Sequence, residues 1–181
     1  MALVVFLKGV NVGGYRRFRP SLLARTLARY GVINVGAAGT FVVMKHVGQA
    51  KLRSELLGRL PFASEIMICS AREIIGLASA ELFAGEAFGP GIVRFVSVLA
   101  RRPQMVLPVP LWLPSRRNWL VKLIELRGRL VLGLYRRKMR TIGALGQLEK
   151  RLGGAATTRN WNTIEQIVGI LQSHAKESNH R

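Results

Sequence analysis

The sequence predicts an α+β protein made of two ferredoxin-like (α/β plait) subdomains, each an antiparallel sheet with helices packed on one face. Strand and helix patterns follow the order β-α-β-β-α-β within residues 2–69, which is the ferredoxin-like order. A glycine- and proline-marked boundary follows at residues 85–91, and the rest of the chain has similar elements. We therefore predict an N-terminal subdomain over residues 1–84, a C-terminal subdomain over residues 85–173 and a flexible tail over residues 174–181.

The N-terminal half begins with an apolar run over residues 2–8 that shows no alternation, which predicts a central strand covered on both faces. Pro20 suits the first position of a helix, and Gly31 can supply its left-handed end. Ser70 and Glu73 form a capping-box pattern that starts a further helix. The other elements expected in this half, two strands, a helix and a strand, span residues 32–35, 41–47, 49–60 and 65–69.

The C-terminal half begins with a strand over residues 92–100. Prolines exclude a helix or a central strand over residues 101–117 and leave room for one edge strand. Asn162, with Glu165 three residues later, predicts the N-cap of the last helix, which residues 155–158 lead into. The other elements expected here, a hairpin of two strands joined at residues 127–129 and a helix, span residues 118–126, 130–136 and 141–152.

The net charge of the chain is its unusual feature. The sequence contains 28 Lys and Arg against nine acidic residues, all of them Glu, which gives a formal charge of +19. Such a field raises the local concentration of anions and attracts polyanions whatever the fold. The alternative interpretation is compositional, since a GC-rich genome favours arginine codons.

The sequence has no apolar run near the ~18 residues that a membrane span needs. Its single cysteine, Cys69, lies in an apolar run, so we predict a buried, inert thiol and a reducing compartment. These observations predict a cytoplasmic protein without a membrane segment.

The loop after the first strand is a candidate anion site. Adjacent glycines allow backbone N–H groups to converge into a concave nest, while an amide and several basic side chains flank it. The loop has neither the Walker A pattern nor the dinucleotide fingerprint. The alternative is that the glycines only form a turn, which the asparagine braces. The predicted anion-binding residues of this loop are Lys8, Asn11, Gly13, Gly14, Arg16 and Arg17.

A second candidate lies near the C-terminus, where Arg159, Asn160 and Asn162 surround a predicted helix start. An arginine at this position adds a forked donor where the helix dipole already favours anions. Arg159 is equally suited to binding backbone carbonyls. Trp161 is suited either to stacking on a base or to filling the joint between subdomains.

Residues 9–14 after an apolar strand, combined with Thr-Thr-Arg-Asn-Trp-Asn-Thr at residues 157–163, resemble an uncharacterised bacterial family, domain of unknown function 1697. Two further segments are similar to it, residues 94–99 and 135–137. The resemblance covers nearly the whole chain, and it implies two ferredoxin-like subdomains and no particular activity. Many members carry a polar Gln-Ser-Gly-Asn turn where this chain has residues 36–40, so chemistry performed by that turn is not implied here.

Catalytic groups are sparse. Without Asp there is no Ser-His-Asp arrangement, and no Cys/His spacing indicates a zinc site, so we predict no catalytic residue, metal or cofactor. His46 is the one histidine inside the predicted folded region, and we expect it to face solvent.

We therefore predict that the protein binds an anionic partner, either nucleic acid or a phosphate-containing small molecule. Phe6 and Phe41 lie on the strands that carry base-stacking aromatics in RNA-recognition domains, although burial in the core explains Phe6 as well. One alternative is an enzyme that holds a small phosphorylated or nucleotide substrate between residues 9–17 and 157–162. Another is an assembly module whose first sheet is covered by the second subdomain or by a twin chain. The oligomeric state does not follow from the sequence.

Overall fold

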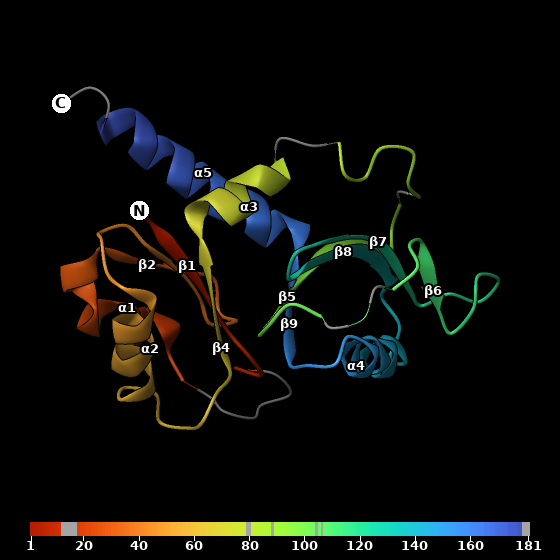
Figure 1. Cartoon of the computed structure of the whole chain (residues 1–181), viewed down its shortest axis with the longest axis horizontal. Helices are drawn as coiled ribbons and strands as arrows, with labels where there is room; N and C mark the ends of the chain where they lie inside the picture. The colour runs from red at the N-terminus through yellow and green to blue at the C-terminus, as the bar shows by residue number, and fades with distance from the viewer. Residues whose placement is uncertain (12–17, 79–80, 88, 104, 106, 179–181) are drawn as a thin grey trace. The chain divides into compact units, whose positions relative to one another are not determined.

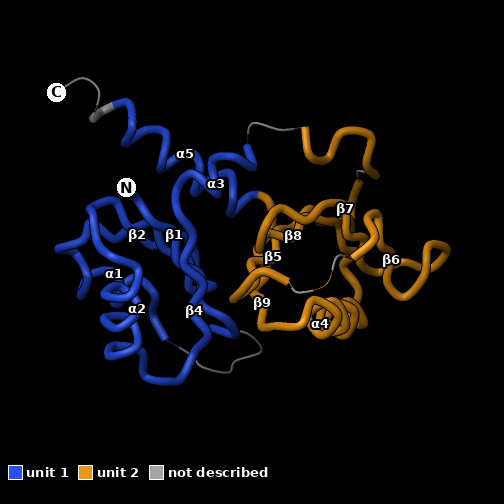
Figure 2. Tube along the Cα trace, viewed as in Figure 1, with its two compact units in different colours: residues 1–80, 162–181 blue, residues 81–161 orange. Residues whose placement is uncertain are grey.

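The computed structural model describes residues 1–11, 18–78, 81–87, 89–103, 105 and 107–178. Within them the chain is an α+β protein with one four-stranded sheet, one five-stranded sheet and five α-helices, and all neighbouring strands run antiparallel, which confirms the predicted class (Figure 1). The chain divides into a first unit, residues 1–80 with 162–181, and a second unit, residues 81–161 (Figure 2). The last helix therefore belongs to the first unit, whereas the sequence placed it in the second.

The sheet of the first unit has the order β2-β3-β1-β4. Its strands are β1 (Leu3–Leu7), β2 (Val32–Val35), β3 (Thr40–Val43) and β4 (Ile66–Ser70). Its helices are α1 (Pro20–Thr26), the 3₁₀ turn η1 (Ala28–Tyr30), α2 (Gln49–Leu57), α3 (Ala71–Ala78) and α5 (Trp161–Ser178). All five residues of β1 are buried between β3 and β4, as its unalternating apolar sequence predicted.

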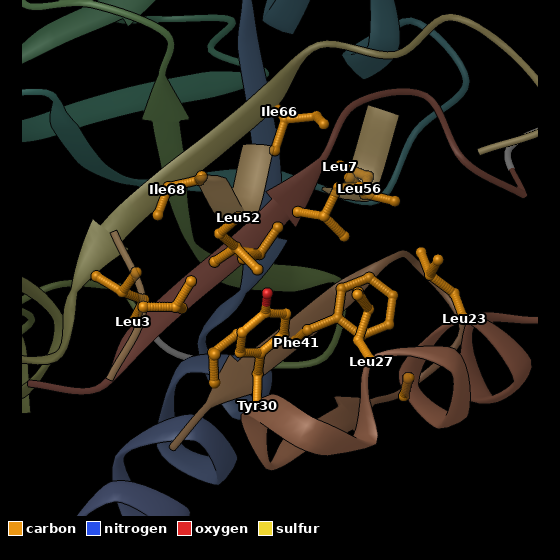
Figure 3. Packing of buried hydrophobic residues seen from close by; sticks show 14 of the residues in the cluster. Leu3, Leu7, Leu23, Leu27, Tyr30, Phe41, Leu52, Leu56, Ile66 and Ile68 are labelled. Atoms are coloured by element: carbon orange, nitrogen blue, oxygen red, sulfur yellow. The ribbon is translucent and has the colours of Figure 1, made fainter. Parts of the chain in front are cut away.

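One face of this sheet packs on α1 and α2 (Figure 3). Because side chains alternate along a strand, Leu3, Val5 and Leu7 of β1 share this face. They form a core with Phe41 of β3 and with leucines from both helices, among them Leu52. These leucines recur at helical spacing in the sequence, which explains why both segments are helical.

The opposite face of the same sheet is also apolar. Val4, Phe6 and Val42 have no exposed surface. Ile33 pairs with Val42 across the strands, and it lines a pocket of about 600 Å³ together with Ile170 of α5. A helix therefore lies on this side as well, so the prediction of helices on one face is wrong for the first unit.

The capping box at the start of α3 is confirmed. The backbone N–H of Ser70 donates to Glu73 Oε2 at 2.7 Å, and the N–H of Glu73 donates to Ser70 Oγ at 3.3 Å. Each residue thereby satisfies a backbone donor of the other at the helix start.

The sheet of the second unit has the order β6-β7-β8-β5-β9. Its strands are β5 (Ile92–Leu99), β6 (Leu111–Leu113), β7 (Val121–Arg127), β8 (Leu130–Arg136) and β9 (Ala156–Asn160). The predicted hairpin is confirmed as β7 and β8, joined through Gly128 at a φ of 62°. The predicted edge strand in the proline-rich stretch is β6.

Helix α4 (Thr141–Arg151) covers one face of this sheet. Ala144 and Leu148 of α4 form a buried cluster with Phe95, Leu123 and Val131 from three strands. The apolar stripe of the helix thus meets the alternating apolar positions of the sheet.

The start of α5 differs from the prediction. Residues 155–158 were expected to lead into the helix, but residues 156–160 form an edge strand along β5, in which β-branched Thr157 and Thr158 fit a pleated strand. The helix begins directly at Trp161, so Asn160 stands in the N-cap position and Asn162 is the second helical residue. The helix also continues to Ser178, where a polar tail was expected from residue 174.

Candidate functional site

Asn11, in the loop after β1, acts as a brace. Its Nδ2 donates to the carbonyls of Phe18 at 3.0 Å and Ala37 at 2.8 Å, and its Oδ1 accepts from the N–H of Phe18 at 3.0 Å. Asn11 has a φ of 54°, a left-handed conformation that asparagine tolerates better than most residues. These bonds fit the alternative that the asparagine holds the turn.

The other residues predicted for this loop divide into two groups. Lys8 is half-buried just after β1, and its backbone N–H donates to the carbonyl of Glu65 at 3.0 Å. The remaining four lie outside the described residues, and they are Gly13, Gly14, Arg16 and Arg17. The anion-binding role of the loop therefore stays a prediction.

Arg159, in β9, is buried with 7% of its surface exposed. Its Nη1 donates to Thr157 Oγ1 at 2.8 Å and to the carbonyl of Thr158 at 2.9 Å. The guanidinium thus binds a carbonyl and a hydroxyl of its own strand, in line with the carbonyl-binding alternative.

Burial also changes the acid–base behaviour of Arg159. Loss of hydration disfavours the charged guanidinium and lowers its pKa to about 10. From about pH 10 up to the higher pKa of the unfolded chain, the unfolded chain binds more protons at this group than the folded one, so the contribution of the group to stability rises as pH rises through that window. At neutral pH the group is charged in both states, and burying the charge opposes folding.

We expect Arg159→Ala to lower the free energy of unfolding by roughly 1 to 3 kcal/mol. Two hydrogen bonds from a charged donor are lost, at about 1.5 to 3 kcal/mol each, and relief from burying the charge offsets part of this. Chemical denaturation measures the change, with exposed Arg151→Ala as the control, expected within about 0.5 kcal/mol of wild type. Unchanged stability with a selective loss of binding to one anion would instead show that Arg159 is a ligand residue.

Asn160 and Asn162 both have exposed side chains, on either side of Trp161. Trp161 is half-buried, and its ring meets Phe83 edge-on with centroids 5.0 Å apart. The edge-on arrangement is favourable for a pair of aromatic rings, so packing against Phe83 explains the position of the Trp161 ring.

The phenylalanines considered for base stacking are unsuitable. Phe6 is fully buried and Phe41 is 1% exposed, so neither ring lies on the surface of the sheet. The interpretation of the first sheet as a surface for RNA bases is therefore wrong for these two residues.

Partly exposed aromatic rings beside cations occur instead in the second unit. The Arg116 guanidinium carbon lies 5.1 Å from the centre of the Trp112 ring, and Lys122 Nζ lies 5.6 Å from it. The Arg136 guanidinium carbon lies 4.5 Å from the centre of the Trp119 ring. We call these five residues the tryptophan–arginine cluster. Both indoles are half-buried and Arg116 is exposed.

This cluster was not predicted from the sequence. The stretch around Trp112 was interpreted as an extended connection with room for one edge strand because of its prolines, and no binding role was assigned to it. The two tryptophans that flank a pair of arginines over residues 112–119 were a visible signal of a basic, aromatic surface.

His46 is exposed and Cys69 is buried, as predicted. No three His, Cys, Asp or Glu side chains among the described residues gather as metal ligands. The described helices include none that is long and apolar enough to cross a membrane.

No family model and no curated protein matches this chain. A solved structure, that of the conserved bacterial protein SP0830 from Streptococcus pneumoniae, is similar in fold. Its TM-score is 0.55 at 16% sequence identity, and the match covers 94% of this chain and 98% of that one. At this identity the likeness concerns the fold alone. The resemblance to domain of unknown function 1697 therefore stays a prediction.

Proposed function

We propose that the protein binds nucleic acid, with single strands preferred, through the tryptophan–arginine cluster of the second unit. The observation that carries the proposal is the placement of half-exposed Trp112 beside Arg116 and of Trp119 beside Arg136. Proteins that bind single strands combine cationic grooves with aromatic rings on which bases stack, at about 1 to 3 kcal/mol per base.

The charge balance supports the same function. With nine acidic residues against 28 Lys and Arg, most basic side chains have no carboxylate to pair with. Within the cluster, Lys122 forms an ion pair with Glu86. Among the described residues, Arg116 and Arg136 form no ion pair, so their charge is available to phosphates.

A ferredoxin-like fold for both units is part of this proposal. The first unit supports it by its element order and its strand order β2-β3-β1-β4. In the second unit, strands β7, β8, β5 and β9 lie in an equivalent order, with β6 added at the edge. A loop containing β6 replaces the helix that would follow β5, and this loop carries Trp112 and Arg116.

Gel retardation with short single-stranded RNA and DNA tests the function. We expect the wild-type protein to retard both at ~50 mM salt, with the logarithm of affinity falling by about 0.7 per phosphate contact for each tenfold rise in salt. Trp112→Ala should weaken binding without changing this slope, because it removes stacking and no charge. Failure of the wild-type protein to retard either polymer at ~50 mM salt would refute nucleic-acid binding.

A further inference from the structure

A small pocket of about 270 Å³ lies within the second unit, near the end of β8. One wall is the loop that precedes β5, and the other is a run of three consecutive basic residues. The lining residues are Pro90, Gly91, Ile92, Arg136, Arg137 and Lys138. The pocket contains no acidic residue, and it belongs to a single unit of the chain.

One backbone hydrogen bond joins the two walls, and a second one closes a turn within the loop wall. The N–H of Arg137 donates to the carbonyl of Gly91 at 2.8 Å, and the N–H of Ile92 donates to the carbonyl of Gly89 at 3.2 Å. Gly91 has a φ of 87°, which a side chain would strain, and space is open where its Cβ would be. The glycine therefore keeps the wall close to the basic run while leaving the pocket open.

The three basic side chains have no acidic counterpart. Among the described residues, Arg136, Arg137 and Lys138 form no ion pair, and Arg137 and Lys138 are exposed. Arg136 lies against Trp119, and its Nε is buried without a hydrogen-bond partner in the described structure. Three adjacent positive charges repel one another, so an anion placed among them would gain strongly charge-assisted hydrogen bonds.

We propose that this pocket binds a phosphate group. Arginine presents a planar fork that matches phosphate oxygens, and lysine adds a compact charge beside it. The volume lies just below the roughly 300 to 1,000 Å³ of pockets that enclose whole ligands, so it fits one phosphate and part of its ester. The inference rests on the proposed function, because the phosphate would belong to a single nucleic-acid strand whose bases reach the neighbouring Trp119.

The first test uses the double variant Arg137→Ala/Lys138→Ala in the full chain. Loss of two phosphate contacts should reduce the fall in the logarithm of affinity by about 1.4 for each tenfold rise in salt. It should also weaken the binding of single-stranded nucleic acid roughly 25-fold at ~0.1 M salt. The control is Arg101→Ala/Arg102→Ala, which removes the same charge from exposed residues of the same unit. Fluorescence anisotropy with a labelled oligonucleotide measures both. An equal loss of affinity in the two variants would overturn the proposal that the pocket binds phosphate, because affinity would then depend on total charge alone.

The second test uses inorganic phosphate alone. Phosphate, compared with chloride at equal ionic strength, should raise the melting temperature of the wild type and of the Arg101→Ala/Arg102→Ala control, and not that of the pocket variant. Equal stabilisation of all three proteins, or of none, would overturn the inference. If phosphate stabilises selectively while the wild type binds no oligonucleotide, the pocket stands as a site for small phosphorylated molecules and the nucleic-acid proposal fails.

Discussion

A chain that ends at Trp161, and so lacks nearly all of α5, is expected to lose the cooperative fold of the first unit. The helix buries four large apolar side chains, Ile164, Ile167, Val168 and Leu171. Burial contributes about 1.5 to 3 kcal/mol for each of them, or about 6 to 12 kcal/mol together. That is as large as the whole net stability of a typical domain, about 5 to 15 kcal/mol.

Circular dichroism and thermal melting measure this loss. The matched control ends at Ser178 and keeps the whole of α5, so it should melt like the full chain. The result matters for the division into units, because α5 joins the first unit although it follows the second in sequence. A Trp161-terminated chain with the native melting transition would contradict the assignment of α5 to the first unit.

Local patterns in the sequence were sufficient for much of the fold. The unalternating run of β1, the Ser70–Glu73 box and the hairpin at Gly128 each depend on residues close in sequence. Strand β9 was missed because its identity depends on pairing with β5, some sixty residues earlier, as in the pair of Ser97 and Thr158. Its threonines and asparagine also suit a helix start, and local propensity could not decide between the two.

The candidate site was less predictable than the fold. Composition shows that the chain is basic, but not which basic residues are exposed. Arg159, predicted from a helix start, is buried in a strand, whereas Arg116 and Arg137 are exposed. Exposure depends on tertiary packing, and the tryptophan–arginine cluster joins residues of β6, β7 and β8 with the loop between β6 and β7.

Gly133, in β8, lies where the second unit has no room for a side chain. It pairs with Leu123 of β7 on one side and with Phe95 of β5 on the other. A Cβ added here would lie 2.2 Å from the carbonyl oxygen of Lys122 and 2.9 Å from two ring atoms of Phe95. The Phe95 ring is fully buried, so neither the ring nor the strand can move without disturbing the core.

We expect Gly133→Ala to destabilise the protein by about 3 kcal/mol. Overpacking a core typically costs about 1 to 3 kcal/mol, and a clash with backbone places this change at the upper end of that range. The melting temperature should fall by about 6 to 12 °C. Gly146→Ala in α4 is the matched control, since nothing lies within 4 Å of its added Cβ and alanine favours a helix by about 0.5 to 1 kcal/mol. Equal melting temperatures for Gly133→Ala and wild type would show that β7 and β8 can separate at this point without loss of packing.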